Sequence, residues 1–220
     1  LLNSVGQDYL LESVSSLRGL GPKSSKRLSE ASIKSILDLL LTLPRKYKHR
    51  DRWIKVDKSL LPRLVTLEVA IKKYIYPKNR RLPMKIEAET GDWPVNILLF
   101  SFNKALLDVY YPVSQNMVIS GELTSDGRSL TMIHPDYSFK PDQSFKIPKI
   151  EPIYPSISGL GNRVLHKIIG NEVNNLNLIP EWYPKKFIQG KNWLSFLESL
   201  RMVHRPMNKS ELSYVRQARE

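Results

Sequence analysis

The 220-residue sequence contains no cysteine, which excludes disulfides, cysteine-ligated zinc and thiol nucleophiles together. Its four histidines, His49, His134, His166 and His204, lie far apart, and no HExxH-like spacing places two of them on one helix face. We therefore expect no metal site. No apolar run approaches the roughly 20 residues that a membrane-spanning helix needs, and the first residues lack the pattern of a signal peptide. A cytoplasmic protein without membrane contacts is expected.

Catalytic motifs are also missing. There is no GxSxG motif and no obvious pair of carboxylates. The segment Gly19-Leu20-Gly21-Pro22-Lys23-Ser24 is not a Walker loop, because that motif needs GxxxxGK[ST] after a buried strand. Two interpretations of this GxG turn stay open. It is either a helix-hairpin-helix-like contact with a DNA phosphate, supported by Lys23, or a tight interhelical turn without a ligand. We expect that this chain alone is not an enzyme.

Acidic residues are scarce relative to basic ones. Lys and Arg number 34 against 21 Asp and Glu, giving a net charge of +13 and an isoelectric point near 9.8. This surplus favours a polyanionic partner such as nucleic acid, and a basic surface that serves only solubility is the alternative. The charge is clustered, with seven basic residues from Arg45 to Lys58 and six from Lys72 to Lys85.

The spacing of apolar residues divides the chain into three regions. Residues 1–60 are predicted to be a helical region containing the GxG turn, with Pro44 ending its last helix. From residue 64 the period becomes two, which predicts strands over 64–71, 84–88, 95–100, 117–123 and 129–133. A short helix is expected over 103–111, with Leu106, Leu107 and Tyr110 as its buried face.

Three strands, a short helix and two strands are the order of an OB-fold barrel, which we place at residues 61–140. In residues 141–220, several prolines predict an extended segment that wraps over a surface, and helical spacing returns after Gly161. The predicted fold class is therefore α+β: a five-stranded OB-fold barrel preceded by a small helical region and followed by an extended segment and carboxy-terminal helices.

Aromatic residues alternate with basic ones in and beside the predicted barrel, a pattern typical of proteins that stack nucleic-acid bases and track the phosphates. Phe100 ends an apolar strand, so burial and stacking are both open; Phe102, beyond that strand, is the better candidate for exposure. Trp93 is either a loop wedge or a cap on the barrel end. The candidates for base stacking are Phe100, Phe102 and Trp93, and those for phosphate binding are Arg80, Arg81, Lys78, Lys72, Lys73 and Lys23.

Several short motifs occur along almost the whole chain in the order found in the RecG family of ATP-dependent DNA helicases. They are Leu17-Arg18-Gly19-Leu20-Gly21-Pro22-Lys23, Leu43-Pro44-Arg45-Lys46-Tyr47-Lys48-His49-Arg50, Ser120-Gly121-Glu122, His134-Pro135-Asp136-Tyr137, Pro152-Ile153-Tyr154-Pro155 through Gly159-Leu160, and His204-Arg205-Pro206. Together they resemble the amino-terminal wedge region of that family.

The resemblance implies an OB-fold wedge that binds branched DNA, namely replication forks and Holliday-type four-way junctions. In the family, this wedge splits strands during branch migration and fork regression in DNA repair and recombination. Aromatic residues around a Phe-Phe-Asn segment stack on bases at the branch. Here the segment is Phe100-Ser101-Phe102-Asn103, so either one phenylalanine is replaced or the alignment shifts by one residue. Arg80 and Arg81 match an arginine pair in the family's first barrel loop.

The resemblance also sets expectations for cofactors and partners. The motor motifs are absent and the chain starts at Leu1, so we expect a fragment, a monomer, whose partners are branched DNA and its own helicase motor. No cofactor is expected in this chain, and ATP and magnesium are implied only for the missing motor. Two alternatives stay open: an RNA-binding OB-fold protein, and a protein-interaction module that docks a partner.

Overall fold

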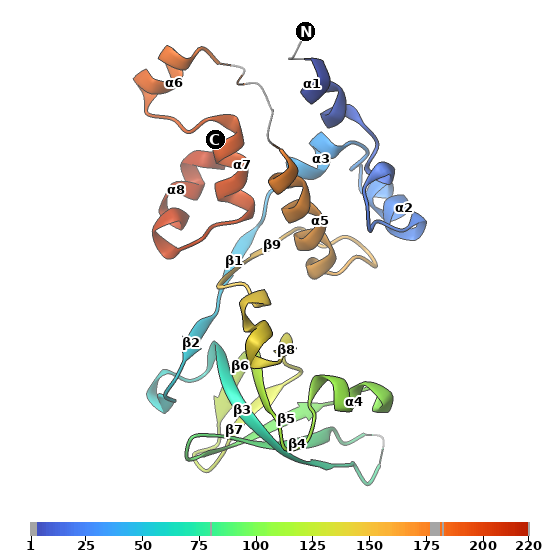
Figure 1. Cartoon of the computed structure of the whole chain (residues 1–220), viewed down its shortest axis with the longest axis vertical. Coiled ribbons are helices and arrows are strands. Elements are labelled where there is room, and N and C mark those ends of the chain that lie inside the picture. The colour runs from blue at the N-terminus through green and yellow to red at the C-terminus, as the bar shows by residue number, and fades with distance from the viewer. Residues whose placement is uncertain (1–3, 80, 177–180, 182, 220) are drawn as a thin grey trace. The chain divides into compact units, whose positions relative to one another are not determined.

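The computed structural model describes residues 4–79, 81–176, 181 and 183–219. Contacts within the chain group it into two compact units. We call residues 49–149 the barrel unit, and residues 1–48 together with 150–220 the helical unit (Figure 1). The first and the last of the three regions predicted from the sequence thus both contribute to the helical unit.

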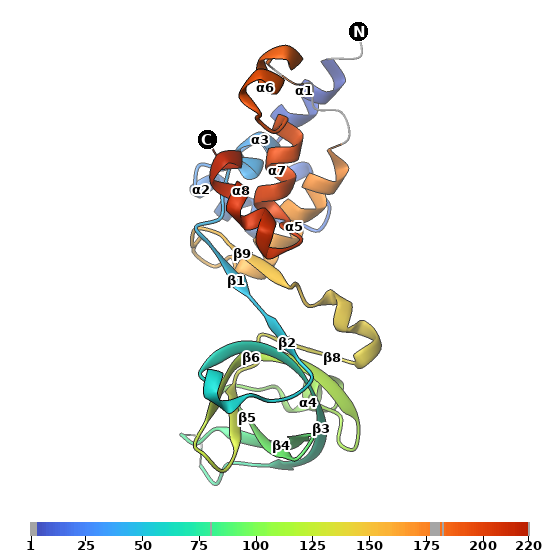
Figure 2. The ribbon, with the colours of Figure 1, turned by 90° about the vertical axis from the view of Figure 1, so that its left-hand side faces the viewer.

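Five strands close the barrel (Figure 2). They are β3 (Arg63–Ile75), β4 (Met84–Thr90), β5 (Trp93–Leu99), β6 (Asn116–Ser125) and β7 (Leu130–Ile133). Their order is β3-β4-β5-β7-β6, and β6 pairs back onto β3. The β5–β7 pair is parallel, whereas the other four pairs are antiparallel. With α4 (Lys104–Tyr110) between β5 and β6, this confirms the predicted α+β class and its five-stranded OB-type barrel.

Alternation of side chains explains why these segments form a barrel. Val65, Leu67, Val69 and Ile71 of β3 are all buried, as a period of two requires when one face of a strand lines a core. Corresponding residues of the other strands fill the interior, and Leu107 of α4 joins them. The Asp126-Gly127 turn predicted between the last two barrel strands joins β6 to β7, with Gly127 at φ 91°.

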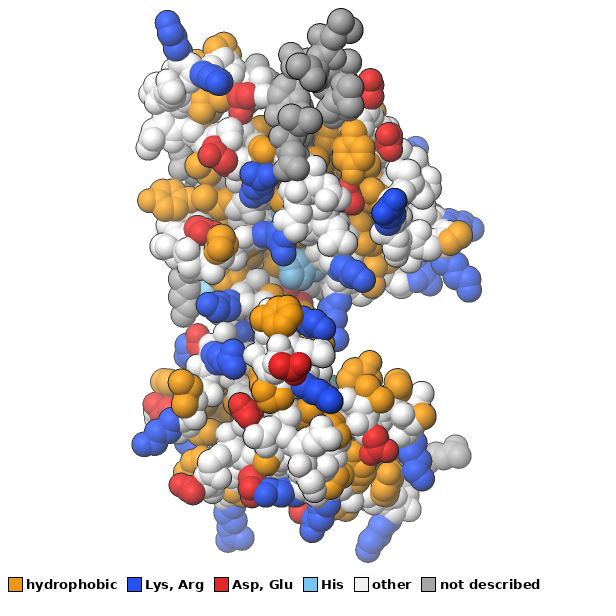
Figure 3. Space-filling model, viewed as in Figure 1, with side chains coloured by type: hydrophobic (Ala, Val, Ile, Leu, Met, Phe, Trp, Pro, Cys, Tyr) orange, Lys and Arg blue, Asp and Glu red, His pale blue; other side chains and the backbone are white. Residues whose placement is uncertain are grey.

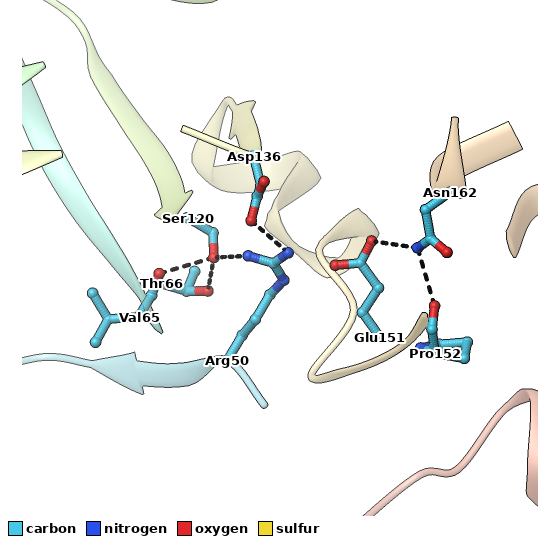
Figure 4. Close-up of polar contacts among 8 residues, drawn as sticks. All are labelled: Arg50, Val65, Thr66, Ser120, Asp136, Glu151, Pro152 and Asn162. Atoms are coloured by element: carbon cyan, nitrogen blue, oxygen red, sulfur yellow. Dashed lines mark hydrogen bonds and ion pairs between the residues drawn. The ribbon is translucent and has the colours of Figure 1, made fainter. Parts of the chain in front are cut away.

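A partly buried ion pair lies beside two further strands of the sheet, β2 (Asp51–Trp53) and β8 (Tyr137–Phe139). Arg50, directly before β2, donates to Asp136 Oδ2 at 2.8 Å and to Ser120 Oγ at 3.1 Å (Figure 4). Ser120 in turn donates to the Val65 carbonyl at 2.8 Å. Arg50 was counted in the basic cluster of residues 45–58, but it is buried. Its positive charge therefore stabilises the fold and does not contribute to a basic surface.

The helical unit combines helices from both ends of the sequence (Figure 1). Its elements are α1 (Ser4–Leu11), the 3-10 turn η1 (Val14–Ser16), α2 (Pro22–Glu30), α3 (Ile36–Leu40), β1 (Lys46–His49), β9 (Ile150–Ile153), α5 (Asn162–Asn175), α6 (Lys185–Lys191), α7 (Phe196–His204) and α8 (Lys209–Arg219). β1 and β9 form a two-stranded sheet. One apolar core contains Leu28 and Ile36 from the first segment and Ile169 and Val173 from the second.

Buried polar bonds also join the two segments of the helical unit. Nε2 of His204 donates to the Leu40 carbonyl at 2.8 Å. Because that carbonyl can only accept, Nδ1 of the neutral ring accepts from the Tyr154 hydroxyl at 3.0 Å. Burial lowers the pKa of His204 to about 4, which keeps the ring neutral. Tyr47 donates to the Val203 carbonyl at 2.7 Å, and Tyr9 donates to the carboxylate of Glu172.

The proline-rich segment after Phe139 is only partly extended. It contains the 3-10 helix η3 (Pro141–Lys146) and the strand β9. Tyr154, Ile157 and Leu160, which follow β9, are buried in the core of the helical unit. Pro141 lies in the first turn of η3 and Pro152 lies within β9. The segment is therefore not extended throughout as predicted, and its last part belongs to the core rather than to a wrap over a surface.

Candidate nucleic-acid interface

One end of the barrel carries exposed aromatic rings on two connections, the β3–β4 loop and the junction between β5 and α4. Tyr76 of the loop and Phe102 of the junction are both exposed, and their ring centroids lie 6.5 Å apart. We call these two residues the ring pair. Lys104 places its ammonium group 5.4 Å from the centroid of Tyr76, so a cation and an aromatic face are combined at this end.

Phe100 lies two residues before Phe102 and is also exposed. The sequence favoured Phe102 for exposure, but Phe100 is the more exposed, 57% against 37%. The reason is that Leu99 is the last inward residue of β5, so the next side chain points away from the core. The Phe100 N–H donates to Nε2 of His134 at 3.0 Å, and the two rings lie 6.0 Å apart.

Hydrogen bonds hold this end of the barrel in place. The Tyr74 hydroxyl, near the end of β3, lies 2.9 Å from Asp108 Oδ1 of α4 and 2.7 Å from the Tyr111 carbonyl. Burial and then the bond to Asp108 raise the pKa of Tyr74 above its usual range. Asn103 caps α4, because its side chain accepts from the Ala105 N–H at 3.0 Å. These hydrogen bonds join the end of β3 to α4, next to the two connections that carry the ring pair.

The predicted phosphate-binding residues of the barrel differ in their surroundings. Lys72 pairs with Glu89, and Lys73 pairs with Glu87 at 3.1 Å. Hydrogen bonds from Lys85 and Lys73 hold the pKa of Glu87 below its usual value. Lys78 and Arg81, in the β3–β4 loop, are exposed and form no ion pair with another described residue. They are the less compensated charges, and the predicted contact at Arg80 lies outside the described residues.

Trp93 lies at the other end of the barrel. It is the first residue of β5, and Phe100 follows the last. Because a strand rises about 3.3 Å per residue, the two ends of β5 lie about 20 Å apart. The Lys58 ammonium group covers the Trp93 ring at 3.5 Å and donates to the Gly127 carbonyl at 2.8 Å. Trp93 packs against the barrel core, so of its two predicted roles its surroundings fit the cap, and the structure does not bring it to the ring pair.

Lys23 belongs to the helical unit, where it is exposed near the start of α2. The GxG turn before it has the predicted geometry: Gly19 has φ 84°, and Gly21 is the N-cap with Pro22 in the first turn. The Gly21 carbonyl accepts from the N–H groups of Ser24 and Ser25. These hydrogen bonds are those of a tight interhelical turn, which needs no ligand. A phosphate contact there stays a prediction.

The sequence placed the buried face of α4 incorrectly. Leu107 is buried, but Leu106 and Tyr110 are exposed, together with Val109. Tyr111, just after the helix, takes the second buried position. Figure 3 shows hydrophobic side chains gathered on and beside α4. Because apolar residues occur on every side of this short helix, their spacing could not identify the buried face. Tyr76 and Lys104 were also missed as site residues, although the alternation of aromatic and basic residues passes through Tyr76.

Among the residues that the structure describes, no three His, Asp or Glu side chains gather in a way that could hold a metal ion. None of the helices described is long and apolar enough to cross a membrane.

Comparison with known proteins places these features in a family context. The family model "RecG wedge domain" matches residues 14–176. The ATP-dependent DNA helicase RecG of Escherichia coli O127:H6 is 27% identical over 212 residues, which cover 93% of this chain and 30% of that protein. RecG of Acidithiobacillus ferridurans is 25% identical over 204 residues, covering 89% of this chain and 28% of that protein.

A solved structure described as RecG bound to a three-way DNA junction superposes with a TM-score of 0.73. It covers 97% of this chain and 31% of that chain at 19% identity, so this likeness concerns the fold. The chain spans about 30% of the length of the E. coli relative that it matches. The match to the family model ends at residue 176, before α6.

Proposed function

The chain belongs to the RecG wedge domain family, and from this premise we propose that it binds branched DNA and acts as the strand-separating wedge of a helicase. Its substrates would be replication forks and four-way junctions during branch migration and fork regression in repair and recombination. ATP and magnesium would be used by motor segments outside this chain, and the chain alone would not hydrolyse ATP. It would act in the cytoplasm as a monomer joined to its motor.

One observation carries the proposal: the exposed rings and the uncompensated cations occur at the same end of the barrel. Stacking of a base on an aromatic ring contributes about 1 to 3 kcal/mol, whatever the base. Lys78 and Arg81 lie in the same loop as Tyr76 and can contact phosphates without reading sequence. An unpaired base at a branch would stack on the ring pair or on Phe100. The sugar-phosphate backbone of the DNA would lie along the β3–β4 loop.

Fluorescence anisotropy with a model fork, a plain duplex and a single strand at matched salt tests the proposal. We expect the fork to bind most tightly, and Phe102→Ala and Phe100→Ala each to weaken fork binding about tenfold through loss of stacking. Phe145→Ala is the matched control, because Phe145 is an exposed phenylalanine in η3. Neutralisation of about five phosphates predicts a slope near −4.5 for log K against log salt.

Equal binding of all three DNA species would contradict the wedge function, as would ring variants that bind like the control. An RNA competitor belongs in the same experiment, because exposed rings and lysines also suit single-stranded RNA. If RNA of equal length displaced the fork tenfold better than DNA does, the barrel would be an RNA-binding module.

A further inference from the structure

A second group of exposed aromatic rings occurs in the helical unit, around α6. Tyr183 and Phe187 stack with centroids 5.6 Å apart, and Trp193 meets both rings edge-on at 6.3 and 5.7 Å. Their exposed fractions are 55%, 43% and 47%. None of them belongs to the core of the helical unit or to the partly buried residues packed against it. We call these three residues the α6 cluster.

The turn after α6 positions the cluster. Asn192 ends the helix in the left-handed conformation, with φ 53°. The Trp193 N–H then donates to the Ile188 carbonyl at 3.0 Å, as in a Schellman-type helix end. This turn brings Trp193 back to Phe187 and leaves the indole on the outside. The geometry of this turn therefore holds Trp193 beside Phe187.

Positive charge predominates around the cluster. Lys185, Lys186 and Lys191 are exposed, and residues 183–193 contain no Asp or Glu. Two acids lie close in sequence, and both accept from backbone N–H groups. Glu181 accepts from Phe196 at 2.7 Å and from Tyr183 of the cluster at 3.4 Å, and Glu198 accepts from Ser195 at 3.0 Å. The three lysines outnumber these two carboxylates. Figure 3 shows basic side chains standing beside hydrophobic ones over α6.

We propose that the α6 cluster is a second binding site for single-stranded nucleic acid, separate from the barrel end. Exposed rings with surrounding lysines are what a flexible strand needs, since bases stack on the rings and phosphates contact the ammonium groups. An apolar protein partner would not be served by the surplus of positive charge. The cluster lies beyond residues 14–176, so its residues are different from those on which the proposed wedge function rests.

The test uses the complete 220-residue chain and a short oligothymidylate, in the wild-type background and in Phe100→Ala/Phe102→Ala. Trp193→Ala should weaken binding about tenfold in the Phe100→Ala/Phe102→Ala background through loss of one stacked base, and less in the wild-type background, where the barrel end still binds. Lys185→Gln/Lys186→Gln leaves the ring packing intact and should reduce the salt slope by about 1.4, at roughly 0.7 per phosphate of a single strand. Lys34→Gln/Lys167→Gln is the matched control, because both are exposed lysines of the helical unit.

A direct readout is photo-crosslinking to an oligothymidylate that carries 5-iodouracil, followed by peptide mapping. Crosslinks to Tyr183, Phe187 or Trp193 would support the site. Crosslinks confined to the barrel, with α6 variants that bind like the lysine control, would overturn it. The two proposals fail separately, because the barrel variants test one set of rings and the α6 variants test the other.

Discussion

The barrel unit and the helical unit differ in how their sequences specify their folds. The barrel unit is one continuous stretch, residues 49–149, whereas the helical unit is built from residues 1–48 and 150–220. In the barrel, inward side chains at every second position are enough to specify the strands. In the helical unit, polar bonds such as Tyr9 to Glu172 and His204 to Leu40 join distant segments. A continuous unit can rely on local pattern, and a divided unit adds specific contacts between its segments.

Core truncation in each unit would test this comparison with the largest effect. Ile119 of the barrel and Ile169 of α5 are both fully buried. Replacing either with alanine should destabilise its unit by about 4 kcal/mol, because transfer and cavity costs add. Hydrogen exchange should show the loss of protection confined to the unit that carries the change. Equal loss in both units after either substitution would mean that the two fold as one cooperative body.

The barrel also contains a polar bond that spans its sequence, and Arg50→Ala measures it. Removal of the guanidinium leaves Asp136 without its buried partner and should cost about 3 kcal/mol, at the low end for broken buried pairs because Asp136 is 35% exposed. Urea unfolding followed by tryptophan fluorescence measures the loss. Arg52→Ala, at an exposed position of β2, is the control and should be nearly neutral. If both variants lost the same stability, Arg50 would have no special role.

Acid should separate the two units, because the buried histidine lies in the helical one. The pKa of His204 falls from 6.5 to about 4 on folding. The unfolded ring therefore takes up a proton that the folded unit resists, so stability declines as the pH drops below 6.5. Between pH 7 and pH 5 the loss should be about 2 kcal/mol. His166, whose pKa burial also lowers, acts in the same direction.

The two histidines of the barrel unit, His49 and His134, are not buried. Denaturation of the whole chain at both pH values, with hydrogen exchange to assign the loss to a unit, makes the measurement. His204→Gln should lower stability at pH 7 and flatten its pH dependence. An unchanged slope in that variant would assign the effect to other groups.

Helix caps should have the smallest effect and should not distinguish the units. Ser35 caps α3 in the helical unit, in a capping box with Asp38, and Asn103 caps α4 in the barrel unit. Replacing either residue with alanine should cost about 1 kcal/mol, because one backbone N–H loses its partner. Thermal unfolding of both variants measures this. A clear difference between them would show that even local bonds depend on how their unit is assembled.

The sequence predicted the barrel well because each strand carries its own alternation. The expected strands over 64–71 and 117–123 lie within β3 and β6, and the short helix lies where expected. The divided helical unit could not be predicted in this way. The pairing of β1 with β9, or of Tyr47 with the Val203 carbonyl, joins residues more than a hundred positions apart and leaves no periodic pattern in either segment.

The candidate site was predicted in part for the same reason. The composition indicated aromatic and basic residues around the barrel, and Phe100, Phe102, Lys78 and Arg81 do lie on its surface. Which end a residue occupies depends on strand direction, so Trp93 was grouped with rings from the opposite end. Whether a lysine has an ion-pair partner depends on the residue opposite it on the neighbouring strand. The sequence therefore does not predict the ion pairs of Lys72 and Lys73.

A hydrogen bond between the two ends of the barrel unit has a consequence for how such a protein can evolve. The Arg50 N–H donates to the Lys149 carbonyl at 3.0 Å, so the chain enters and leaves this unit side by side. A module whose two ends lie close together can be exchanged, enlarged or removed as one piece, because a short linker is enough to reconnect the rest of the chain. The barrel unit could therefore be replaced by another module while the helical unit keeps its own internal contacts.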